Sequence, residues 1–498
     1  ALSGFVVSQQ FNPNFLDNLV YIPFILLGIE EVASGKRSVK LPLFLAISLI
    51  TDFYTGYMMC LFVALYTFYV VFSKDISLKE AALKLGKVAL FALIGVGLAA
   101  FWLLPVFSAL LESKASAGST FAWSWNSLND LVAMPQKFIL GSFGEKEWGD
   151  SKALPQLFIG GLGLFGCCTF FAKREITLRK KLAATVVLLV LLLSFSIQGF
   201  DQIWHMGQRP VGFYFRNSWV ANTFMLVLAS ESLMKWKDEF RLYEFLVAIF
   251  GFGSVLVLST LRSLQYVETP QKILAFIIWT IILLAFFFRR ADRVRRLQLT
   301  AGVVIVELMV SSVVGFRRAP YFIGNSGLKE QMEFAMAFDE EGFSSKNTFT
   351  RMEMHKGLSH ANFPIAFGYN GASHFTSSLE YSLIDEMSHI GLPTSQSVVN
   401  YTNRNVILDS LFGVSRFMMD GDEKRVFADV RGMYAKEGAM KNFAIYRNPY
   451  AFSLGYLTNE NTATNITFEK NQPVANLNQL LQVIGLSGTN AVTELSVG

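Results

Sequence analysis

The chain has 498 residues, of which 52% are hydrophobic, 14% are aromatic and only 16% are charged. A soluble protein of this length carries more charge, so the composition excludes a soluble globular class and indicates a polytopic membrane protein. The formal net charge of +5 would fit an anionic partner. Because no basic-aromatic nucleic-acid motif is found, nucleic-acid binding is the weaker interpretation.

Short runs of lysine and arginine separate the long apolar stretches in the first three-fifths of the chain. Basic residues collect in short cytoplasmic loops of membrane proteins, so these runs are expected to share one side of the membrane. This topology accounts for the positive net charge. The runs are Lys36, Arg37 and Lys40; Lys74, Lys79, Lys84 and Lys87; Lys173, Arg174, Arg179, Lys180 and Lys181; Lys235, Lys237 and Arg241; and Arg289, Arg290, Arg293, Arg295 and Arg296.

The apolar stretches divide into about ten expected spans, since roughly 20 apolar helical residues cross a bilayer core. One division falls inside an uninterrupted apolar run, at Phe53/Tyr54. A single helix over 38–73 would put the first two basic runs on opposite faces, so a hairpin is preferred there. The expected spans are Phe15 to Ala33, Ser38 to Phe53, Tyr54 to Ser73, Lys84 to Phe107, Leu154 to Ala172, Leu182 to Ile197, Val211 to Met234, Leu242 to Leu261, Lys272 to Phe288 and Leu297 to Gly315.

The two ends of the chain are both expected outside the cytoplasm. Residues 1–4 show no initiator Met, basic region or cleavage signal, so we expect further spans upstream of Ala1. The last residues carry no closing element, which predicts a truncated end there as well. Residues 1–315 thus form the predicted multi-span transmembrane domain.

Residues 316–498 differ in composition, with 15 Lys+Arg, 18 Asp+Glu and no apolar run long enough to span. They predict an extracytoplasmic mixed α/β domain. Its expected strands are Thr350 to Met354, Ser415 to Met419, Asn442 to Tyr446 and Phe452 to Leu457, and its expected helices are Gly327 to Phe338 and Leu379 to Ile390.

Ionisable groups near a membrane are costly, so each is a candidate site residue. The topology puts Asp17, Asp52 with Tyr54, His205 and Arg216 at the outer face. Arg216 is the strongest candidate, because its planar fork suits the phosphate of a lipid-linked substrate; the alternative is a structural ion pair.

The other candidates also have structural alternatives. Asp17 would suit an exposed helix start, and Asp52 would cap a turn. His205 would anchor the membrane interface together with Trp204. Glu307, near the middle of the last span, is expected to pair with another helix or to line a polar path, and pairing is favoured.

The predicted outer loop from Leu110 to Ala153 is rich in aromatic residues. These indicate segments that lie in the membrane interface and guide a lipid, with ordinary loop packing as the alternative. They are Phe121, Trp123, Trp125, Phe138, Phe143 and Trp148.

Motifs of soluble enzymes are absent from the sequence. We find no P-loop, no His/Cys cluster with metal-ligand spacing and no nucleophile elbow, so neither a cofactor nor a metal is expected. The three cysteines, Cys60, Cys167 and Cys168, lie inside apolar stretches, so no disulfide framework is expected either.

Several sequence blocks resemble one family. The membrane part contains Leu16-Asp17-Asn18-Leu19, Ile22-Pro23, Leu27-Gly28-Ile29-Glu30, Asp52 to Met58, Ile203-Trp204-His205 and Phe213-Tyr214-Phe215-Arg216. The last part contains Tyr369 to Ser378, Leu408 to Val414, Tyr446 to Ala451 and Leu454-Gly455-Tyr456. In this order, over essentially the whole chain, they resemble the YfhO family of bacterial membrane proteins.

The resemblance implies a glycosyltransferase of the GT-C class in the bacterial plasma membrane. Such an enzyme moves a sugar from an undecaprenyl-phosphate carrier to an extracytoplasmic cell-envelope acceptor, such as teichoic or lipoteichoic acid. Its catalytic base, an Asp in the first outer loop, would precede Ala1, so no residue of this chain is assigned as the base. Two departures weaken the transfer of roles: Asp52 stands where Asn is expected, and Ser311-Ser312 where an Asn is common.

Other functions remain open. A transporter or lipid flippase is compatible with the number of spans and with Glu307, although the other polar candidates lie at one face. A non-catalytic envelope assembly factor, in which the last domain binds a partner, is a third interpretation.

Overall fold

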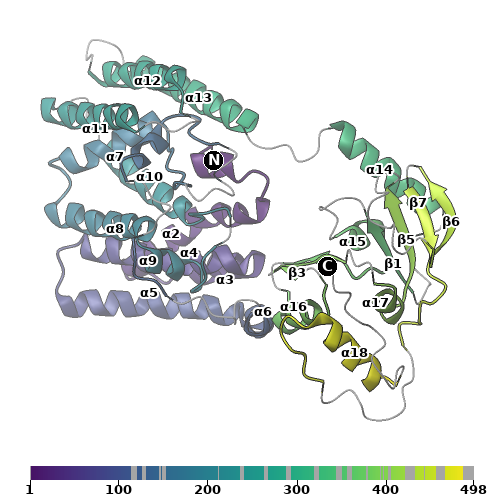
Figure 1. The fold of residues 1–498 in the computed structure, drawn as a ribbon. Helices are drawn as coiled ribbons and strands as arrows, with labels where there is room; N and C mark the ends of the chain where they lie inside the picture. The colour runs from purple at the N-terminus through teal and green to yellow at the C-terminus, as the bar shows by residue number, and fades with distance from the viewer. Residues whose placement is uncertain are drawn as a thin grey trace. The chain divides into compact units, whose positions relative to one another are not determined.

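The computed structural model forms two compact units (Figure 1). Unit 1 comprises residues 1–105 and 119–320, and unit 2 comprises residues 106–118 and 321–498. The structure describes residues 2–113, 121–125, 131–144, 147, 153–210, 212–235, 241–262, 267–287, 293–318, 325–341, 343, 350–355, 362–376, 379–392, 394–395, 397–401, 405–420, 432–441, 443–455 and 466–485.

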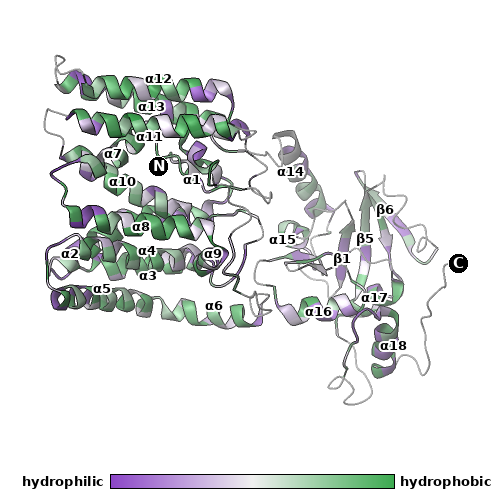
Figure 2. Ribbon diagram, turned by 60° about the vertical axis from the view of Figure 1, so that its left-hand side comes forward, coloured by the Kyte–Doolittle hydropathy of each residue, from purple (hydrophilic) through white to green (hydrophobic). Residues whose placement is uncertain are grey.

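Apart from an isolated bridge between Trp125 and Ile197, the regular secondary structure in the described residues of unit 1 is helical. Its longer helices are predominantly hydrophobic along their length (Figure 2). The short helices are α1 (Gly4–Ser8), η1 (Pro13–Phe15), η2 (Asp17–Val20), η4 (Met134–Phe138) and α9 (Gln198–Trp204). The longer ones are α2 (Ile22–Ala33), α3 (Lys40–Thr51), α4 (Phe53–Phe72), α5 (Leu78–Leu98), α7 (Gly161–Ala172), α8 (Leu178–Ser196), α10 (Ser218–Met234), α11 (Leu242–Leu261), α12 (Thr269–Phe287) and α13 (Arg293–Arg318). Helix α6 (Ala100–Glu112) begins in unit 1, and its residues from Val106 onward belong to unit 2.

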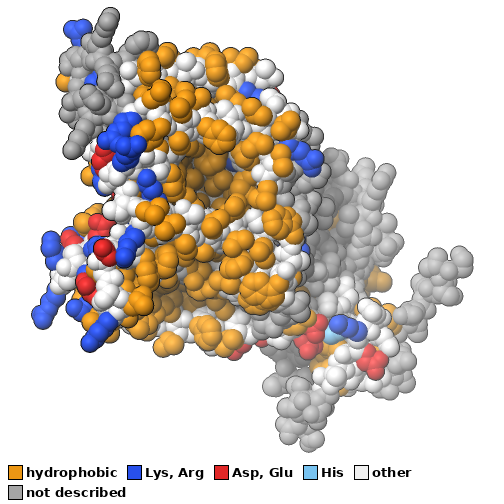
Figure 3. All heavy atoms as spheres, turned by 90° about the vertical axis from the view of Figure 1, so that its left-hand side faces the viewer, with side chains coloured by type: hydrophobic (Ala, Val, Ile, Leu, Met, Phe, Trp, Pro, Cys, Tyr) orange, Lys and Arg blue, Asp and Glu red, His pale blue; other side chains and the backbone are white. Residues whose placement is uncertain are grey.

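Among the described residues, five helices are long and apolar enough to cross a membrane: α4, α5, α11, α12 and α13. Each of the ten expected spans contains a helix, but the number that cross a bilayer stays a prediction. Figure 3 shows one face of the molecule, where hydrophobic side chains cover most of the described surface and Lys and Arg side chains gather along one edge. The chain is therefore a multi-pass membrane protein.

Contacts between loops place the first four basic runs at one end of the helices. The Lys84 ammonium donates to the Ala33 carbonyl (2.9 Å) at the end of α2. Arg179 before α8 pairs with Asp75 after α4 (2.9 Å between Nη1 and Oδ1). The Lys235 ammonium after α10 donates to the Glu175 carbonyl (3.2 Å) beside the third run.

The predicted hairpin between α3 and α4 is confirmed. Helix α3 ends at Thr51, α4 begins at Phe53, and Asp52 between them has extended backbone dihedral angles. The Asp52 carboxylate accepts hydrogen bonds from the backbone N–H groups of Tyr54 (3.1 Å) and Thr55 (3.3 Å). This N-cap satisfies two of the four N–H groups that a helix start leaves unpaired.

Three expected spans begin later than predicted, near this same end of the bundle. Helix α2 starts only at Ile22, after two 3₁₀ helices, and α10 starts at Ser218 rather than near 211. Helix α7 starts at Gly161 because Gly160 has a left-handed φ of 79° and the preceding residues 153–160 are buried without regular secondary structure. Irregular backbone inside a membrane domain must be hydrogen-bonded by protein groups; here the Asn222 amide donates to the Gln156 carbonyl (2.8 Å).

The start of α7 is held by a carboxylate from α13. Glu307, which is fully buried, accepts a hydrogen bond at Oε2 from the Gly161 N–H (2.8 Å). A carboxylate at a helix N-terminus is favoured by the helix dipole. Helix α7 then packs closely on α10, where a Cβ added at Gly166 would stand 2.9 Å from Ala229.

Unit 2 contains a four-stranded sheet and a three-stranded sheet. The larger has the order β1-β5-β7-β6, with β1 and β5 parallel and the other pairs antiparallel; the smaller has the order β2-β4-β3. The strands are β1 (Arg351–His355), β2 (His374–Phe375), β3 (Thr394–Ser395), β4 (Val398–Val399), β5 (Val414–Asp420), β6 (Ala435–Met440) and β7 (Phe443–Arg447). The helices are α14 (Asn325–Glu340), α15 (Phe363–Phe367), α16 (Tyr381–His389), α17 (Val406–Leu411) and α18 (Pro473–Val483).

Three of the four strands expected in this region are confirmed as β1, β5 and β7, and both expected helices as α14 and α16. The expected strand from Phe452 is wrong over 452–455, which are not in a strand, and the remaining two residues lie outside the described part. The physical reason is a turn: Tyr450 N–H donates to the Asn448 side-chain oxygen (3.0 Å), and Phe452 N–H donates to the Ser410 carbonyl (3.0 Å) instead of a ladder partner.

Two buried carboxylates organise the core of unit 2. Glu353 on β1 accepts from the Ala372 N–H, the Ser373 N–H (3.2 Å) and the Ser373 hydroxyl (2.9 Å). Asp409 on α17 accepts from the Tyr401 hydroxyl (2.8 Å) and from the Tyr434 hydroxyl. Burial raises the pKa of Glu353 to about 7 and that of Asp409 to about 6.

Candidate functional site

The segment before α10 has an unusual backbone. Met206, Phe213 and Phe215 have φ values of 55°, 48° and 55°, in the left-handed region that side chains other than glycine disfavour. Each such residue costs about 1–3 kcal/mol and persists where the surrounding structure holds it. This conformation places Arg216 two residues before α10 begins, outside the helix in which the sequence predicted it.

The Arg216 guanidinium is oriented by oxygen acceptors and aromatic rings. Its Nε donates to the Phe213 carbonyl (3.1 Å), Nη2 to the Gly212 carbonyl (3.2 Å) and Nη1 to the Tyr54 hydroxyl (3.1 Å). Its carbon Cζ lies 5.0 Å from the ring centre of Phe15 and 5.3 Å from that of Tyr54. These are cation–π distances, so η1, α4 and the segment before α10 meet at this side chain.

This half-buried guanidinium has no carboxylate partner among the described residues. Of its five N–H donors, the three bonds above use one on each nitrogen, so each terminal nitrogen keeps one N–H. A planar guanidinium with unused N–H donors can hydrogen-bond the oxygens of a phosphate or carboxylate.

His205 lies beside Tyr54, with 6.1 Å between the ring centres. Its Nδ1 donates to the Asp201 carbonyl (2.7 Å), which fixes the tautomer and leaves Nε2 as the basic nitrogen. Burial lowers the pKa of His205 to about 3, so the imidazole is neutral near pH 7. His205 and Trp204 are both buried, so neither ring is on the lipid-facing surface.

Asp201 is a site residue that the sequence analysis missed. It lies on α9, between α8 and α10, is buried, and has its Oδ1 3.4 Å from His205 Nδ1. Burial raises the pKa of Asp201 to about 7, against the opposing charges of Arg209 and Arg216. The two side chains are therefore within ion-pair distance but do not form an ion pair, because the His205 imidazole is uncharged. A helical spacing of four between Asp201 and His205 was the available signal.

The remaining two predicted residues have different surroundings. Asp52 is close to Tyr54, but its carboxylate caps the start of α4. The Thr55 hydroxyl also donates to it (2.6 Å). Asp and Asn cap helices about equally well, which gives Asp52 a reason to stand where Asn was expected. Asp17 is exposed in η2, and among the described residues its carboxylate makes no hydrogen bond or ion pair.

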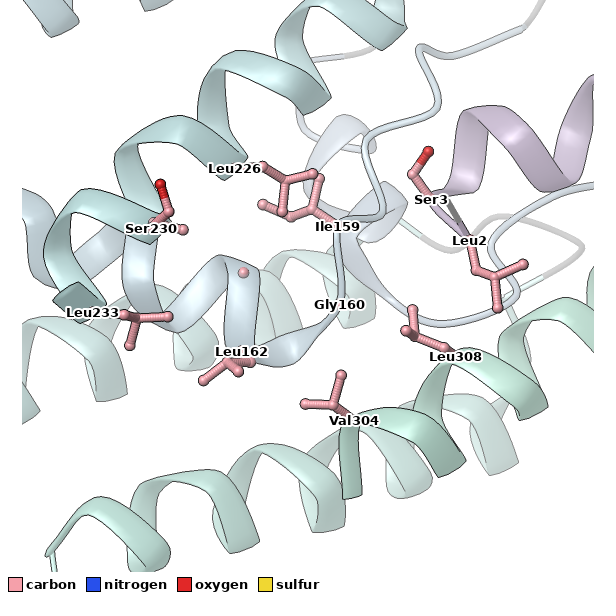
Figure 4. Close-up of a pocket in the computed structure, with 12 residues that line it drawn as sticks. Leu2, Ser3, Ile159, Gly160, Leu162, Leu226, Ser230, Leu233, Val304 and Leu308 are labelled. Atoms are coloured by element: carbon pink, nitrogen blue, oxygen red, sulfur yellow. The ribbon is translucent and has the colours of Figure 1, made fainter. Parts of the chain in front are cut away.

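A separate apolar cavity of about 300 Å³ lies between α1, α7, α10 and α13 (Figure 4). Leu226 and Leu233 of α10, Leu162 of α7 and Val304 and Leu308 of α13 line it, together with residues at the start of the chain. Glu307 is close by, since a Cβ added at Gly160 would stand 3.5 Å from its Oε2. Glu307 Oε1 is buried without a hydrogen-bond partner.

The described part of the chain holds no group of three His, Cys, Asp or Glu side chains arranged for a metal ion. At Arg216 a cation and a hydroxyl lie together, and both can donate hydrogen bonds to an anion. Tyr54 contributes that hydroxyl, whose oxygen accepts from Arg216 and whose proton remains available for a ligand.

Comparison with known proteins identifies the chain's family. The family model described as bacterial membrane protein YfhO matches residues 1–496. No curated protein and no solved structure matches the chain. The resemblance seen in the sequence blocks is thus confirmed over nearly the full length. The chain belongs to the YfhO family of bacterial membrane proteins.

Proposed function

We propose that this chain is part of a membrane glycosyltransferase, which moves a sugar from an undecaprenyl-phosphate carrier to an extracytoplasmic cell-envelope acceptor such as teichoic or lipoteichoic acid. The observation that carries the proposal is the unpaired Arg216 guanidinium, with a free N–H on each terminal nitrogen. The extracytoplasmic position of the site and of unit 2 belongs to the same proposal.

Position and surroundings support a phosphate attached to a lipid. Arg216 stands at the start of α10, so a phosphate bound there would lie at the end of the helix layer while its hydrocarbon chain extends beside the helices. The flanking rings of Phe15, Tyr54 and Phe213 are apolar surfaces for the first isoprene units. A soluble anion would not need these rings.

In the proposed reaction, the bond from the sugar's anomeric carbon to the carrier phosphate breaks, and a bond from that carbon to an acceptor hydroxyl oxygen forms. The phosphate leaves with an added negative charge, which Arg216 and the Tyr54 hydroxyl would stabilise as it develops. The hydroxyl proton passes to a general base. No residue of this chain is assigned as that base. His205 and Asp201 would hold Tyr54 in place, Asp52 would position Tyr54 by capping α4, and Asp17 is the remaining proposed substrate-side residue.

The test measures binding of undecaprenyl phosphate to the full-length protein in nanodiscs, with undecaprenol as the uncharged comparison lipid. Arg216→Ala should weaken phosphate-dependent binding by about tenfold or more, since hydrogen bonds to charged groups contribute about 1.5–3 kcal/mol. Arg209→Ala, an exposed arginine of the same segment, is the matched control and should leave binding nearly unchanged. Equal binding of both lipids by the wild type would remove the anion site.

Transfer is then assayed with radiolabelled undecaprenyl-phosphate sugar and a teichoic acid acceptor. The intact protein should label the polymer, and Arg216→Ala should not, at equal protein level. Binding without any transfer would favour the non-catalytic assembly factor instead.

A transporter or lipid flippase is the second candidate, and Glu307 is the observation that favours it. Ionisable residues inside membrane segments often mark substrate or ion paths, and Glu307 is buried at the start of α7 beside an apolar cavity. Movement of a fluorescent polyprenyl phosphate across vesicles distinguishes the two. A flippase would lose this movement on Glu307→Gln, whereas the glycosyltransferase proposal expects no such movement in the wild type.

A further inference from the structure

A five-residue segment of unit 1, residues 121–125, presents three aromatic rings to the surroundings. The exposed fractions are 50% for Phe121, 66% for Trp123 and 56% for Trp125. The other described aromatic residues of the same predicted loop differ, since Phe143 is buried and Phe138 is partly buried. Large exposed rings in close sequence mark a surface that another phase or molecule covers.

The backbone of this aromatic segment is fixed to α9. Trp125 forms an antiparallel bridge with Ile197, Gln198 N–H donates to the Ser124 carbonyl (3.1 Å), and Ala122 N–H donates to the Gln202 side chain (3.1 Å). These bonds hold the segment in place while its rings stay exposed.

The rings also pack where they meet α9. Trp123 lies edge-on to Phe200, with 5.7 Å between ring centres, and stacks on Phe121 at 6.3 Å. A Cβ added at Gly199 would stand 2.7 Å from the Trp123 ring, so only glycine lets the indole approach this closely. One side of the ring group is therefore packed and the opposite side is open.

The segment lies at the level where the membrane-crossing helices end. Ile197, its partner, is the residue directly after α8. Tyr57, in the first turns of the candidate span α4, donates its hydroxyl to the Ile203 carbonyl (2.9 Å) near the end of α9. Helix α9 and the segment fixed to it thus lie at the boundary of the apolar layer. Tryptophan prefers that boundary, because its ring is apolar and its N–H is polar.

We propose that Phe121, Trp123 and Trp125 form an interfacial anchor that inserts into the headgroup region of the lipid bilayer. The partner is the lipid surface rather than a sugar polymer, because the rings are held at the depth of the helix ends and pack on an apolar neighbour, Phe200. Since α9 also carries Asp201 and ends beside His205, the anchor fixes the depth of the Arg216 site relative to the membrane. The inference requires only a membrane protein and does not depend on sugar transfer.

The test uses the full-length protein in phosphatidylethanolamine and phosphatidylglycerol vesicles, with acyl chains brominated near the carbonyl or near the chain end. Bromine quenches tryptophan emission at close range. The double variant Trp123→Phe/Trp125→Phe should lose a large part of the quenching by the shallow bromine and little of that by the deep bromine. Trp279→Phe, which removes a buried tryptophan of the same unit, is the matched control and should preserve the shallow quenching.

Quenching by aqueous iodide completes the design. An anchored segment is shielded from iodide in vesicles and becomes accessible in a short-chain detergent. If shallow-bromine quenching were the same in the double variant and the wild type, or if iodide quenched Trp123 and Trp125 fully in vesicles, the anchor would be wrong. The second result would indicate a water-exposed surface for a soluble partner such as a polysaccharide.

Discussion

Some buried polar groups of unit 1 lack the hydrogen-bond partners that two buried carboxylates of unit 2 have. In unit 2, Glu353 and Asp409 accept hydrogen bonds from backbone, serine and tyrosine donors. In unit 1, buried atoms such as Asp201 Oδ1, His205 Nε2 and Glu307 Oε1 have no hydrogen-bond partner.

This difference distinguishes polar groups that stabilise the fold from polar groups that can still bind a ligand. A buried polar group is normally satisfied, so each exception calls for a reason. The bonded carboxylates of unit 2 join separate segments into one core. In unit 1, Arg216 keeps unused N–H donors, and Asp201 Oδ1 and His205 Nε2 have no hydrogen-bond partner. Four substitutions or conditions test this contrast.

The largest expected effect is on the stability of unit 2. Asp409→Ala removes the acceptor of two tyrosine hydroxyls in a buried site and should lower the free energy of unfolding of unit 2 by about 3–5 kcal/mol. The measurement is protease susceptibility of unit 2 in the purified full chain at increasing urea concentrations. Asp385→Ala, on the partly exposed face of α16, should cost less than about 1 kcal/mol. If both variants lowered the free energy of unfolding equally, the buried Asp409 would have no special role in the stability of unit 2.

A pH dependence should follow from the same carboxylates. Their folded-state pKa values, about 7 for Glu353 and about 6 for Asp409, lie above the ordinary values, so the folded state binds more protons than the unfolded state. The free energy of unfolding of unit 2 should therefore rise as the pH falls from about 8 to about 5, by up to about 3 kcal/mol for Glu353. Urea titrations at several pH values measure it.

Glu353→Gln sharpens this prediction, because the amide keeps an acceptor oxygen and does not titrate. The variant should have a flatter pH profile than the wild type and at least equal stability at pH 8. Stability that fell on acidification in the wild type would contradict the assignment.

A smaller effect is expected at the candidate site. Tyr54→Phe removes the hydroxyl that orients Arg216 and should weaken undecaprenyl phosphate binding by about 0.5–1.5 kcal/mol, roughly two- to tenfold. Tyr57→Phe is the matched control. It removes a hydroxyl of the same helix that donates to the Ile203 carbonyl and not to Arg216. A loss of the same size in both variants would mean that Tyr54 acts through the fold and not through Arg216.

The smallest effect concerns Asp52. Asp52→Asn keeps the N-cap of α4 and should change the thermal stability of the protein by less than about 0.5 kcal/mol, whereas Asp52→Ala should cost about 1 kcal/mol. Ligand binding should be unchanged in the asparagine variant. If Asp52→Asn preserved stability but abolished sugar transfer, Asp52 would be an acid of the site. A residue whose carboxylate is already hydrogen-bonded would then take part in the reaction.

Much of the fold was predictable because bilayer length and local pattern act along the chain. The apolar lengths located a helix within each expected span, and Leu242 to Leu261 matched α11 at both ends. The hairpin at Asp52 followed from charge asymmetry, and the strands β1, β5 and β7 from short apolar runs. The strand expected from Phe452 failed because a side-chain oxygen of Asn448 redirects the chain, and a hydrophobic run does not record such a turn.

The sequence predicted which residues belong to the candidate site, but not how they are arranged. Charge next to apolar sequence singled out Arg216, His205 and the pair Asp52 and Tyr54, but it gave no distances between them. Asp201 was missed since an acidic residue in a polar stretch looks solvated until its burial is known.

By itself, the sequence determined that this is a multi-pass membrane protein of the YfhO family, because composition, span length and residue order are properties of the chain alone. Only the tertiary structure decided where helices α2, α7 and α10 begin. It also decided which polar side chains contact one another. Left-handed residues such as Phe213 and Phe215 are held there by packing from segments distant in sequence. That packing brings Tyr54 to Arg216 and leaves one unused N–H donor on each terminal nitrogen of the guanidinium.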